Sequence, residues 1–385
     1  MNYWENPYTE ILHQHPHREC VRCVMDTSDP FITFDKSGVC NHCNQYEALQ
    51  SRLPLENNRH KVIESLVERL QTAGRGHDYD CLIGLSGGVD SSYLAWFVVK
   101  KLKLRPLIIH VDTGWNSELA VMNIQNVINK LQLDMHTVVI DWNEIRDIQR
   151  SYFLSGIANL DVPQDHAFVS SLYSMSRKFK IKNILNGGNL QTESILPAAW
   201  GYDANDSRNL LDIHKRYGRR TLSTYPIITT FTKNLFYPYI CRIKTHRPLN
   251  YIDYNKIEAK NLLIDELGWR DYGGKHHESR FTRFFQSHYL PKKFGYDKRK
   301  AHLSSLIVSE QLTRENAVKE LLKPLYNKVI FEDDLNFFLK KLEISRKEYD
   351  EVMSHRPALY SDFDNNAKFN SVLINIREKF RSKFK

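Results

Sequence analysis

Short apolar runs alternate with longer amphipathic stretches between residues 78 and 250 of this 385-residue chain. Each short run is typical of a buried strand, and each longer stretch is typical of a helix that covers it. The pattern predicts strands at 81–85, 106–111, 135–140 and 182–185, and helices at 53–71, 91–104, 117–131 and 165–179. Such alternation indicates an α/β fold with a doubly wound parallel sheet.

The chain divides into four predicted parts. Residues 1–50 hold four of the six cysteines, and residues 51–77 are predicted to be a helical linker. Residues 78–250 form the predicted α/β domain, and residues 251–385 are predicted to be a basic, mostly helical C-terminal region.

The turn after the first predicted strand gives the strongest chemical signal. It contains Ser86-Gly-Gly-Val-Asp-Ser91, directly before a predicted helix. Two glycines allow a tight turn whose N–H groups, together with the helix N-terminus, can bind phosphates. The hydroxyls of Ser86 and Ser91 add donors, and Asp90 is placed to hold a Mg²⁺ ion that the phosphates share. The alternative is an ordinary glycine turn before a helix.

Other nucleotide-binding patterns are absent from this turn. It lacks the lysine of the Walker pattern, so cleavage of a γ-phosphate is not indicated, and it lacks G-x-G-x-x-G. The order of residues instead resembles the PP-loop of the ATP pyrophosphatase superfamily. That resemblance implies transfer of AMP to a carbonyl oxygen, with pyrophosphate leaving, and assigns catalytic roles to Asp90, Ser86 and Ser91.

Two more strand ends are expected beside this loop. Ligands of open α/β sheets bind beyond the carboxyl ends of the strands. Asp112 and Thr113 follow the second strand and are candidates for contacting adenine or ribose, although Asp112 could simply cap the next helix. A second glycine pair follows the strand at 182–185. The predicted ATP-binding residues are therefore Gly84, Leu85, Ser86, Gly87, Gly88, Val89, Asp90, Ser91, Val111, Asp112, Thr113, Gly187 and Gly188.

Polar residues after the second glycine pair and in a later basic segment are candidates for substrate binding. The predicted substrate-binding residues are Asn189, Gln191, Glu193, Lys275, His276, Glu278 and Lys293. Lys298 and Arg299 are predicted to assist catalysis by binding the departing pyrophosphate. The alternative for this basic segment is a solvated helix face whose aromatic residues pack into a core.

The cysteines Cys20, Cys23, Cys40 and Cys43 form two C-x2-C pairs separated by a turn-rich insert. This spacing predicts a zinc ribbon in which four thiolates bind one Zn²⁺ ion. A site with four thiolates leaves no open position, so its predicted role is structural. Two disulfides or a redox pair are the alternatives.

The net charge and the apolar content limit the kinds of ligand and the cellular location that are expected. A formal net charge of +9 favours anionic ligands without demanding a nucleic acid. No apolar run approaches the length of a membrane span, and the N-terminus lacks a signal-peptide pattern, so a cytoplasmic location is expected.

Four pieces of the chain together resemble the N-acetyl sugar amidotransferases, the WbpG/PseA/LegG-like branch of PP-loop enzymes. They are the cysteine module ending in Cys40-Asn-His-Cys43, Leu85-Ser-Gly-Gly-Val-Asp-Ser-Ser92, Asn186-Gly-Gly-Asn-Leu-Gln-Thr-Glu-Ser194 and Lys293-Phe-Gly-Tyr-Asp-Lys-Arg-Lys-Ala-His-Leu-Ser-Ser305. The resemblance implies ATP-dependent conversion of an N-acetyl group on a nucleotide sugar to an acetamidino group, in the synthesis of surface polysaccharides such as the O-antigen of lipopolysaccharide or of nonulosonic-acid sugars. It implies ammonia from separate partners, a glutaminase and an ammonia-delivering barrel subunit similar to those of imidazole glycerol phosphate synthase.

Two other classes of function stay open at this point. A PP-loop tRNA thiolation ligase also joins such a loop to zinc-binding cysteines, but it typically needs further cysteines, and only Cys81 and Cys241 are spare. The basic charge is also modest for an RNA surface. A zinc-ribbon adaptor without catalysis is the third class, and the complete Ser86, Asp90 and Ser91 set argues against it.

Overall fold

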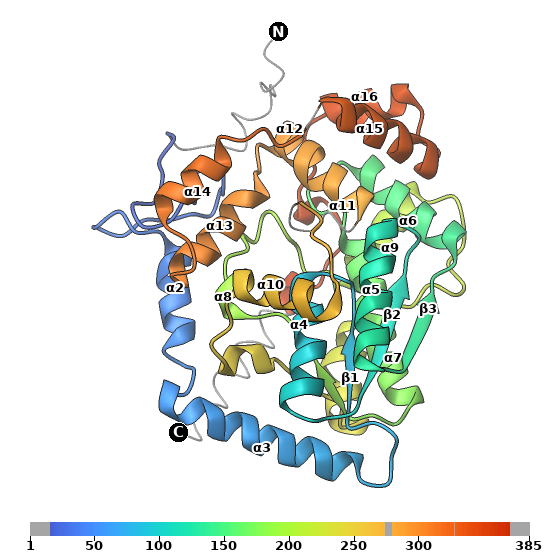
Figure 1. The fold of residues 1–385 in the computed structure, drawn as a ribbon. Helices are drawn as coiled ribbons and strands as arrows, with labels where there is room; N and C mark the ends of the chain where they lie inside the picture. The colour runs from blue at the N-terminus through green and yellow to red at the C-terminus, as the bar shows by residue number, and fades with distance from the viewer. Residues whose placement is uncertain (1–15, 274–278, 327, 370–385) are drawn as a thin grey trace.

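The computed structural model describes residues 16–273, 279–326 and 328–369. Five parallel strands form a single sheet in the order β3-β2-β1-β4-β5 (Figure 1). The strands are β1 (Cys81–Gly84), β2 (Pro106–Asp112), β3 (Met135–Val139), β4 (Asn183–Leu185) and β5 (Lys244–His246). The predicted doubly wound α/β fold is confirmed. The short edge strand β5 was missed because its sequence, Lys-Thr-His, has no apolar signal.

Helices surround the sheet and make up most of the C-terminal region, as predicted. The α-helices are α2 (Asn41–Gln50), α3 (Glu56–Gly74), α4 (Val89–Trp96), α5 (Glu118–Leu131), α6 (Trp142–Ser155), α7 (Val162–Lys178), α8 (Leu190–Glu193), α9 (Ser207–Tyr217), α10 (Lys256–Leu267), α11 (Arg280–Phe284), α12 (Leu290–Phe294), α13 (Lys298–Val308), α14 (Arg314–Leu321), α15 (Lys328–Leu342) and α16 (Arg346–Ser354). Three π-helices, η1 (Phe97–Lys101), η2 (Thr232–Ile240) and η4 (Phe285–Tyr289), and two 3₁₀-helices, η3 (Pro248–Tyr251) and η5 (Tyr360–Asp362), are also present.

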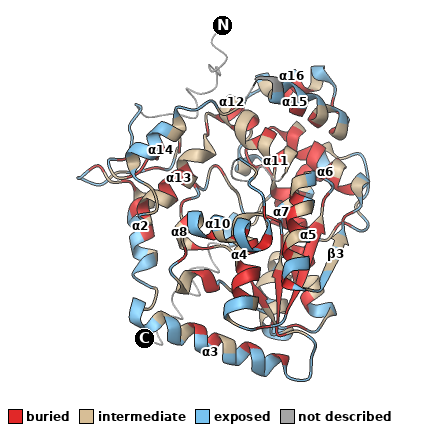
Figure 2. Ribbon diagram, in the orientation of Figure 1, coloured by how far each residue is buried: buried red, intermediate tan, exposed pale blue. Residues whose placement is uncertain are grey.

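The two faces of the sheet belong to two different hydrophobic cores. In β2, Leu107 and Ile109 join one core, while Ile108 between them joins the other. This alternation follows from the two-residue period of a strand. Helix α7 packs on one face, and α4 packs on the opposite face, with α10 and α5 against it. Both faces are therefore covered, and Figure 2 shows the central strands buried.

The C-terminal region packs back onto the α/β domain. Helix α10 lies against α4, α13 lies against α8, and both α15 and α16 contact α6. An isolated antiparallel bridge joins Asn116, after β2, to Ser279, before α11. Contacts therefore run across the predicted boundary near residue 250, and the four-part division stays a prediction.

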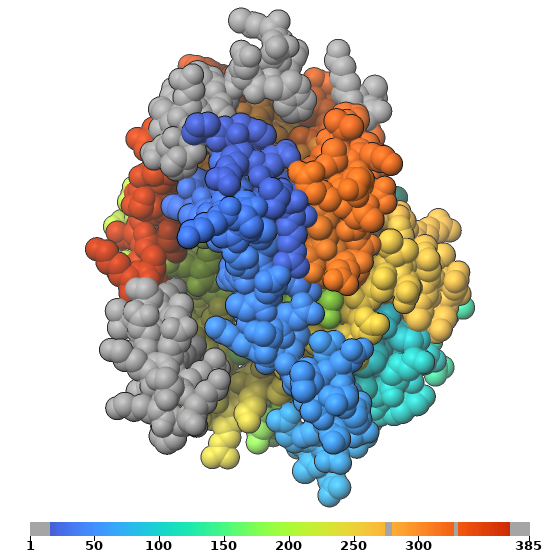
Figure 3. Space-filling model, turned by 90° about the vertical axis from the view of Figure 1, so that its left-hand side faces the viewer, coloured from blue at the N-terminus to red at the C-terminus, as the bar shows by residue number. Residues whose placement is uncertain are grey.

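The N-terminal cysteine module docks on α13 and α14. Figure 3 shows the module, in blue, side by side with the segment that holds these two helices, in orange. Val24 packs with Leu303 and Ala317, and its backbone N–H donates to Ser304 Oγ at 3.2 Å. Arg314 Nε donates to the carbonyl of Cys23 at 3.1 Å. The module is thus tied to the C-terminal region through both apolar and polar contacts.

Within the described ranges, none of the helices has the length and apolar character needed to cross a membrane.

Candidate functional site

The loop between β1 and α4 has the conformation that its glycines predict. Gly87 has φ +86°, a left-handed backbone that side chains disfavour, and the start of α4 at Val89 points its first N–H groups toward the loop. Ser86 Oγ lies 3.2 Å from Ser91 Oγ and accepts from the Gly88 N–H at 3.4 Å. The two hydroxyls and the helix N-terminus therefore gather donors around one small volume, as a phosphate site requires.

Two aromatic side chains from the C-terminal region fix this loop from behind. Trp269 Nε1 and Tyr272 Oη both donate to the carbonyl of Gly87, at 2.8 and 2.9 Å. These two hydrogen bonds hold the Gly87 carbonyl, and with it the turn, in a fixed position. No pattern in the sequence indicated this role. Both residues lie in or beside a basic, aromatic-rich segment, but their distance from the loop along the chain hid the contact.

Asp90 is oriented by a buried tyrosine. Tyr254 Oη donates to Asp90 Oδ1 at 2.5 Å, and Tyr254 is almost fully buried. Burial, followed by the charge of Asp90, raises the pKa of Tyr254 well above its ordinary value, so it stays a donor. One carboxylate oxygen is thus held by Tyr254 and the other is left to bind a cation. No pattern in the sequence pointed to Tyr254.

The second glycine pair lies against the first loop, as predicted. A methyl group added at Gly187 would stand 2.9 Å from the Asp90 carbonyl and 3.3 Å from the Ser91 nitrogen. Only glycine fits this close approach without moving the start of α4. Gly188 faces Glu193, whose carboxylate would be 3.5 Å from such a methyl group. The structure therefore brings together Asp90, Ser91, Gly187, Gly188 and Glu193.

Other predicted ATP-binding residues lie beneath the loop or at its edge. Leu85 uses its N–H for the Ile109 carbonyl at 2.9 Å and its carbonyl for His110 Nδ1 at 3.1 Å, so its polar groups serve the fold. Gly84 faces Phe168, and Val111 is a core residue. Ser92, whose hydroxyl adjoins the loop in the sequence, is fully buried. We therefore restrict the phosphate-facing set to residues 86–91.

Asp112 and Thr113 stand at the carboxyl end of β2, as expected, but both have local partners. Asp112 Oδ1 accepts from the Gly114 N–H at 2.8 Å, and Thr113 Oγ1 donates to Gln164 Oε1 at 3.0 Å. Asp112 therefore shapes the turn after the strand and does not cap α5, since Ser117 does so by accepting from the Ala120 N–H.

The predicted substrate residues divide into exposed and structural ones. Glu193 is exposed beside Gly188. Asn189 is buried and caps α8, accepting from the Thr192 N–H at 2.9 Å. Gln191 is partly buried, and its Oε1 has no hydrogen-bond partner among the described residues. Of these three side chains, Glu193 is the one that solvent and a substrate reach most easily.

The predicted basic residues are not gathered at one place. Arg299 binds Asp297 and the carbonyls of Glu320, Leu321 and Lys323, which lie at the end of α14 and just beyond it. Lys293 is buried, and its Nζ donates to the carbonyls of Val352 and His355. The structure does not bring these two side chains to the loop, because both are used to hold the C-terminal region together. Lys275, His276 and Glu278 lie outside the described residues.

Lys298 is placed differently, near Asp165 of α7 and Asp161, the residue that precedes this helix. The Asp165 side chain is exposed, but nearby protein atoms still remove part of its hydration. This desolvation, followed by the charge of the neighbouring Asp161, raises the pKa of Asp165 to about 7. The charge of Lys298 lowers that pKa and the charge of Glu193 raises it. Asp161 also accepts from Thr282 Oγ1 at 3.0 Å. Asp165, Lys298 and Glu193 are therefore electrostatic neighbours, a grouping that sequence reasoning did not find.

The elevated pKa of Asp165 predicts a pH-dependent effect of the Asp165→Asn variant on stability. A carboxyl group with a raised pKa in the folded state favours folding below its ordinary pKa near 4 and loses this contribution as the pH rises toward 7. Asparagine mimics the protonated form. The variant should match the wild type at pH 4 and be more stable at pH 8, by about 1 kcal/mol, since solvent screens the group.

Urea unfolding at both pH values measures this difference. Asp253→Asn, at an exposed aspartate, is the matched control. An Asp165→Asn effect of equal size at pH 4 and pH 8 would contradict the prediction.

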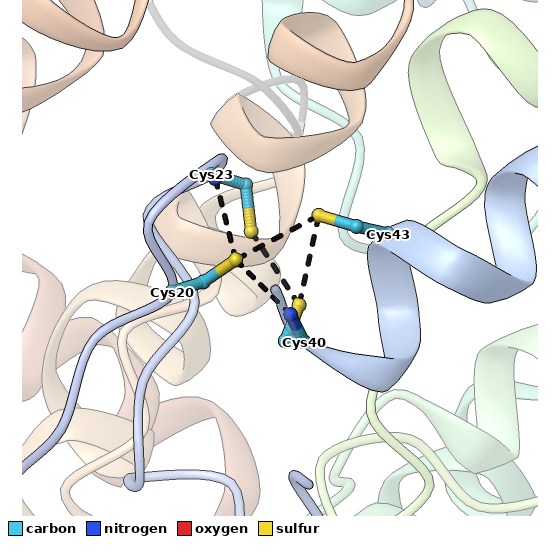
Figure 4. A group of neighbouring side chains, drawn as sticks. All are labelled: Cys20, Cys23, Cys40 and Cys43. Carbon is cyan, nitrogen blue, oxygen red and sulfur yellow. Dashed lines mark hydrogen bonds between the residues drawn. The ribbon is translucent and has the colours of Figure 1, made fainter. Parts of the chain in front are cut away.

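The four cysteines of the N-terminal module form a compact group. Cys20 and Cys23 come from a loop, Cys40 and Cys43 come from the start of α2, and all four sulfur atoms point toward one another (Figure 4). All four side chains are buried, and the cysteines are unpaired in disulfides. Backbone N–H groups of Arg22 and Cys40 lie 3.4 and 3.2 Å from Cys20 Sγ. Such N–H contacts stabilise thiolates.

The distances between the sulfur atoms fit a tetrahedral metal site. They are 3.9 Å for Cys20–Cys43, 3.7 Å for Cys23–Cys40 and 3.6 Å for Cys40–Cys43. A tetrahedron with metal–sulfur bonds of about 2.3 Å has edges of about 3.8 Å, whereas a disulfide requires about 2.05 Å. The geometry of the cluster therefore fits a metal site.

Two family models match separate parts of the chain. Residues 59–196 match the NAD synthase model, and residues 278–377 match the model described as the C-terminal domain of LPS biosynthesis protein WbpG-like. The first match covers β1, β2, β3 and the glycine loops, and it defines a PP-loop ATP pyrophosphatase domain. The chain joins this match to a WbpG-like C-terminal match, the combination expected of the WbpG-like PP-loop family. The predicted family is confirmed.

Individual relatives are distant. An uncharacterized protein of Methanocaldococcus jannaschii is 22% identical over 326 residues, covering 82% of this chain and 97% of that protein. Similar solved structures include an NH3-dependent NAD synthetase from Campylobacter jejuni (15% identity, 78% of this chain and 98% of the other, TM-score 0.31). Another is a U34-tRNA thiolase from Methanococcus maripaludis (16% identity, 84% and 89%, TM-score 0.30). With TM-scores this low, these likenesses carry no argument about function.

Proposed function

We propose that the protein is an ATP-dependent amidotransferase that converts an N-acetyl group of a nucleotide sugar to an acetamidino group. The observation that carries the proposal is the joining of the Ser86–Asp90–Ser91 loop to a C-terminal domain like that of an LPS biosynthesis protein. We place the reaction in the cytoplasm, where ATP and nucleotide sugars are available, in a pathway to a surface polysaccharide or a nonulosonic-acid sugar.

The proposed reaction has two steps. The amide oxygen attacks the α-phosphorus of ATP, and the bond from this phosphorus to the oxygen of the β-phosphate breaks. Pyrophosphate departs, and the product of the first step is an O-adenylyl imidate. Ammonia then adds to the imidate carbon, one proton is lost, and departure of AMP gives the amidine. Activation is necessary because an amide expels its oxygen very slowly, whereas AMP leaves readily.

The loop residues supply charge stabilisation in the first step. The N–H groups at the start of α4 and the hydroxyls of Ser86 and Ser91 would bind the phosphates as negative charge moves onto pyrophosphate. The free oxygen of Asp90 is the group that would hold Mg²⁺, while Tyr254 keeps that carboxylate in place. Bound Mg²⁺ neutralises the polyphosphate and polarises its oxygens.

The second step needs a group near the imidate that binds ammonium and takes its proton. Asp165, with a pKa of about 7 and in a position that solvent reaches, suits this task better than an ordinary carboxylate. Lys298 beside it would keep the carboxylate from becoming too basic. We propose that ammonia comes from a separate glutaminase and barrel subunit. Cys81 is buried in β1, where burial raises its pKa, and Cys241 lacks a glycine-rich nucleophile turn.

The four-cysteine site is proposed to hold a structural Zn²⁺ ion. Its four thiolates leave no position for a substrate, and the ion would tie the loop of Cys20 and Cys23 to α2. The tRNA thiolation alternative is weakened because Cys81 is fully buried, which leaves the partly buried Cys241 as the other spare cysteine.

The experiment is incubation of the pure protein with ATP, Mg²⁺, ammonium and a panel of N-acetylated nucleotide sugars. We expect one sugar to yield a product one mass unit lighter, with oxygen replaced by NH, and one AMP and one pyrophosphate per product. Release of pyrophosphate only with tRNA and a sulfur donor would overturn the proposal in favour of thiolation.

A further inference from the structure

An arginine-rich cavity lies apart from the PP-loop, between α6, the segment that follows α9, and the end of α15. Its volume is about 390 Å³. In Figure 1, α15 and α16 lie close to α6 at the upper edge of the molecule, and their contacts agree with this view. The basic side chains that line the cavity are Arg146, Arg150, Arg219 and Arg220.

The carboxylates around this cavity do not balance its guanidinium groups. Glu343 pairs with Arg146, and Glu348 pairs with Arg150 at 2.6 Å. Arg219 stands 3.7 Å from the same Glu348. The Arg220 guanidinium has no ion-pair or hydrogen-bond partner among the described residues. Four cations thus share two pairing carboxylates, which leaves a positive site.

A third carboxylate, that of Asp147, serves the backbone instead. Its Oδ2 accepts from the N–H groups of Arg219 and Arg220 at 2.8 and 3.0 Å and from His214 Nε2 at 3.0 Å. Glu144, one turn earlier on α6, binds the N–H groups of Ser223 and Thr224 in the same way. These two acids fix the 219–224 segment, so the two exposed arginines project from a backbone that is already ordered.

Arg150 gives an independent observation that favours an anion in this cavity. Its side chain is about 95% buried, and its Nε has no hydrogen-bond partner among the described residues. Burial and then the charge of Arg219 lower the pKa of Arg150 below its ordinary value. Buried guanidinium donors in native proteins are normally satisfied. An oxyanion in the cavity would pair with this buried cation and reduce its repulsion with Arg219.

A neighbouring cavity of about 360 Å³ shares Arg220 and has a different lining. Here the side chains are amides, hydroxyls and carboxylates, among them Asn143, Thr221 and Thr224. Such groups bind the hydroxyls of a sugar ring, whereas guanidinium groups bind phosphate. The two cavities together therefore offer adjacent places for a phosphate and for a polyhydroxylated ring.

We propose that this double cavity binds a phosphorylated carbohydrate, with the phosphate on Arg150, Arg219 and Arg220 and the ring in the neighbouring cavity. The site is separate from the PP-loop and does not depend on the proposed reaction.

Arginine labelling with phenylglyoxal, mapped by mass spectrometry, tests the site residue by residue. The probes are inorganic phosphate, N-acetylglucosamine 1-phosphate and UDP-N-acetylglucosamine. We expect both sugar probes to protect Arg219 and Arg220 at concentrations that leave Arg52 and Arg75, both exposed and distant in sequence, fully reactive. Stronger protection by the nucleotide sugar would identify a nucleotide-linked ligand, and equal protection would identify a sugar phosphate.

Paired variants measure the affinity by calorimetry. Arg219→Gln/Arg220→Gln should weaken binding of the better sugar probe about tenfold or more. Arg52→Gln/Arg75→Gln, which removes the same charge elsewhere, should leave it unchanged. Equal binding by the two double variants, or absence of protection, would overturn the proposal. Protection by inorganic phosphate as strong as by either sugar would overturn its carbohydrate part.

Failure of this binding proposal can be distinguished from failure of the proposed reaction. Ser86→Ala alters the PP-loop alone and should leave the protection of Arg219 and Arg220 unchanged, whatever happens to pyrophosphate release. Loss of protection in Ser86→Ala would contradict the separate site.

Discussion

Replacing Asp90 with asparagine is expected to reduce pyrophosphate release on the order of a thousandfold at saturating ATP. The carboxylate oxygen that Tyr254 does not occupy is the ligand available to Mg²⁺ at the loop, and asparagine keeps the shape while removing the charge. Steady-state release of pyrophosphate, measured over a range of Mg²⁺ concentrations, gives the result.

Tyr254→Phe is the matched variant for this prediction. It removes only the 2.5 Å hydrogen bond to Asp90 and retains the ring contact with Tyr93. We expect a loss of about tenfold, expressed mainly as a higher Mg²⁺ requirement, since the carboxylate remains but is less well oriented. Full activity of Asp90→Asn, or a dependence on Mg²⁺ that is unchanged in both variants, would show that Asp90 does not hold the ion.

Replacing Cys43 with serine is expected to remove the bound metal and to destabilise the N-terminal module by roughly 3 kcal/mol or more. Binding of a structural zinc ion contributes about 10–16 kcal/mol to the folding of small zinc domains, and loss of one thiolate forfeits a large part of it. The effect should spread to α13 and α14, because the module supplies Val24 to their apolar contact and the Cys23 carbonyl to Arg314.

Metal content by mass spectrometry, together with hydrogen exchange of residues 298–321, measures both parts of this effect. Cys241→Ser, outside the cluster, is the control and should retain one zinc per chain. Iron with visible absorbance in the wild type would contradict zinc as the metal. Normal exchange of α13 and α14 in Cys43→Ser would contradict the proposed coupling.

The local features of the site could be predicted from the sequence because they depend on neighbouring residues. The glycines and serines of residues 86–91 dictate a phosphate-binding turn through their own backbone freedom and hydroxyls. The two C-x2-C pairs bring their thiolates together within short segments, and the four predicted strands have apolar runs that admit few alternatives.

Residues that act across the fold could not be predicted in this way. Tyr254, Trp269 and Tyr272 reach the loop from positions more than 160 residues away along the chain, as their partner separations show. Conversely, Lys293 was predicted to bind the substrate and Arg299 to bind pyrophosphate, yet the fold uses both to bind backbone carbonyls. Charge and residue type do not reveal which long side chains a C-terminal region will bury.

The sequence by itself therefore determined the class of the protein: a parallel α/β sheet, a PP-loop at the end of its first strand, and a four-cysteine cluster with the spacing of a metal site. These follow from short-range periodicity, turn geometry and ligand spacing. Only the tertiary structure decided which distant groups complete the site, from the hydrogen bond of Tyr254 to Asp90 to the electrostatic grouping of Asp165, Lys298 and Glu193. The physical reason is that such contacts depend on how separate elements pack, and packing is set by the shape and burial of whole surfaces.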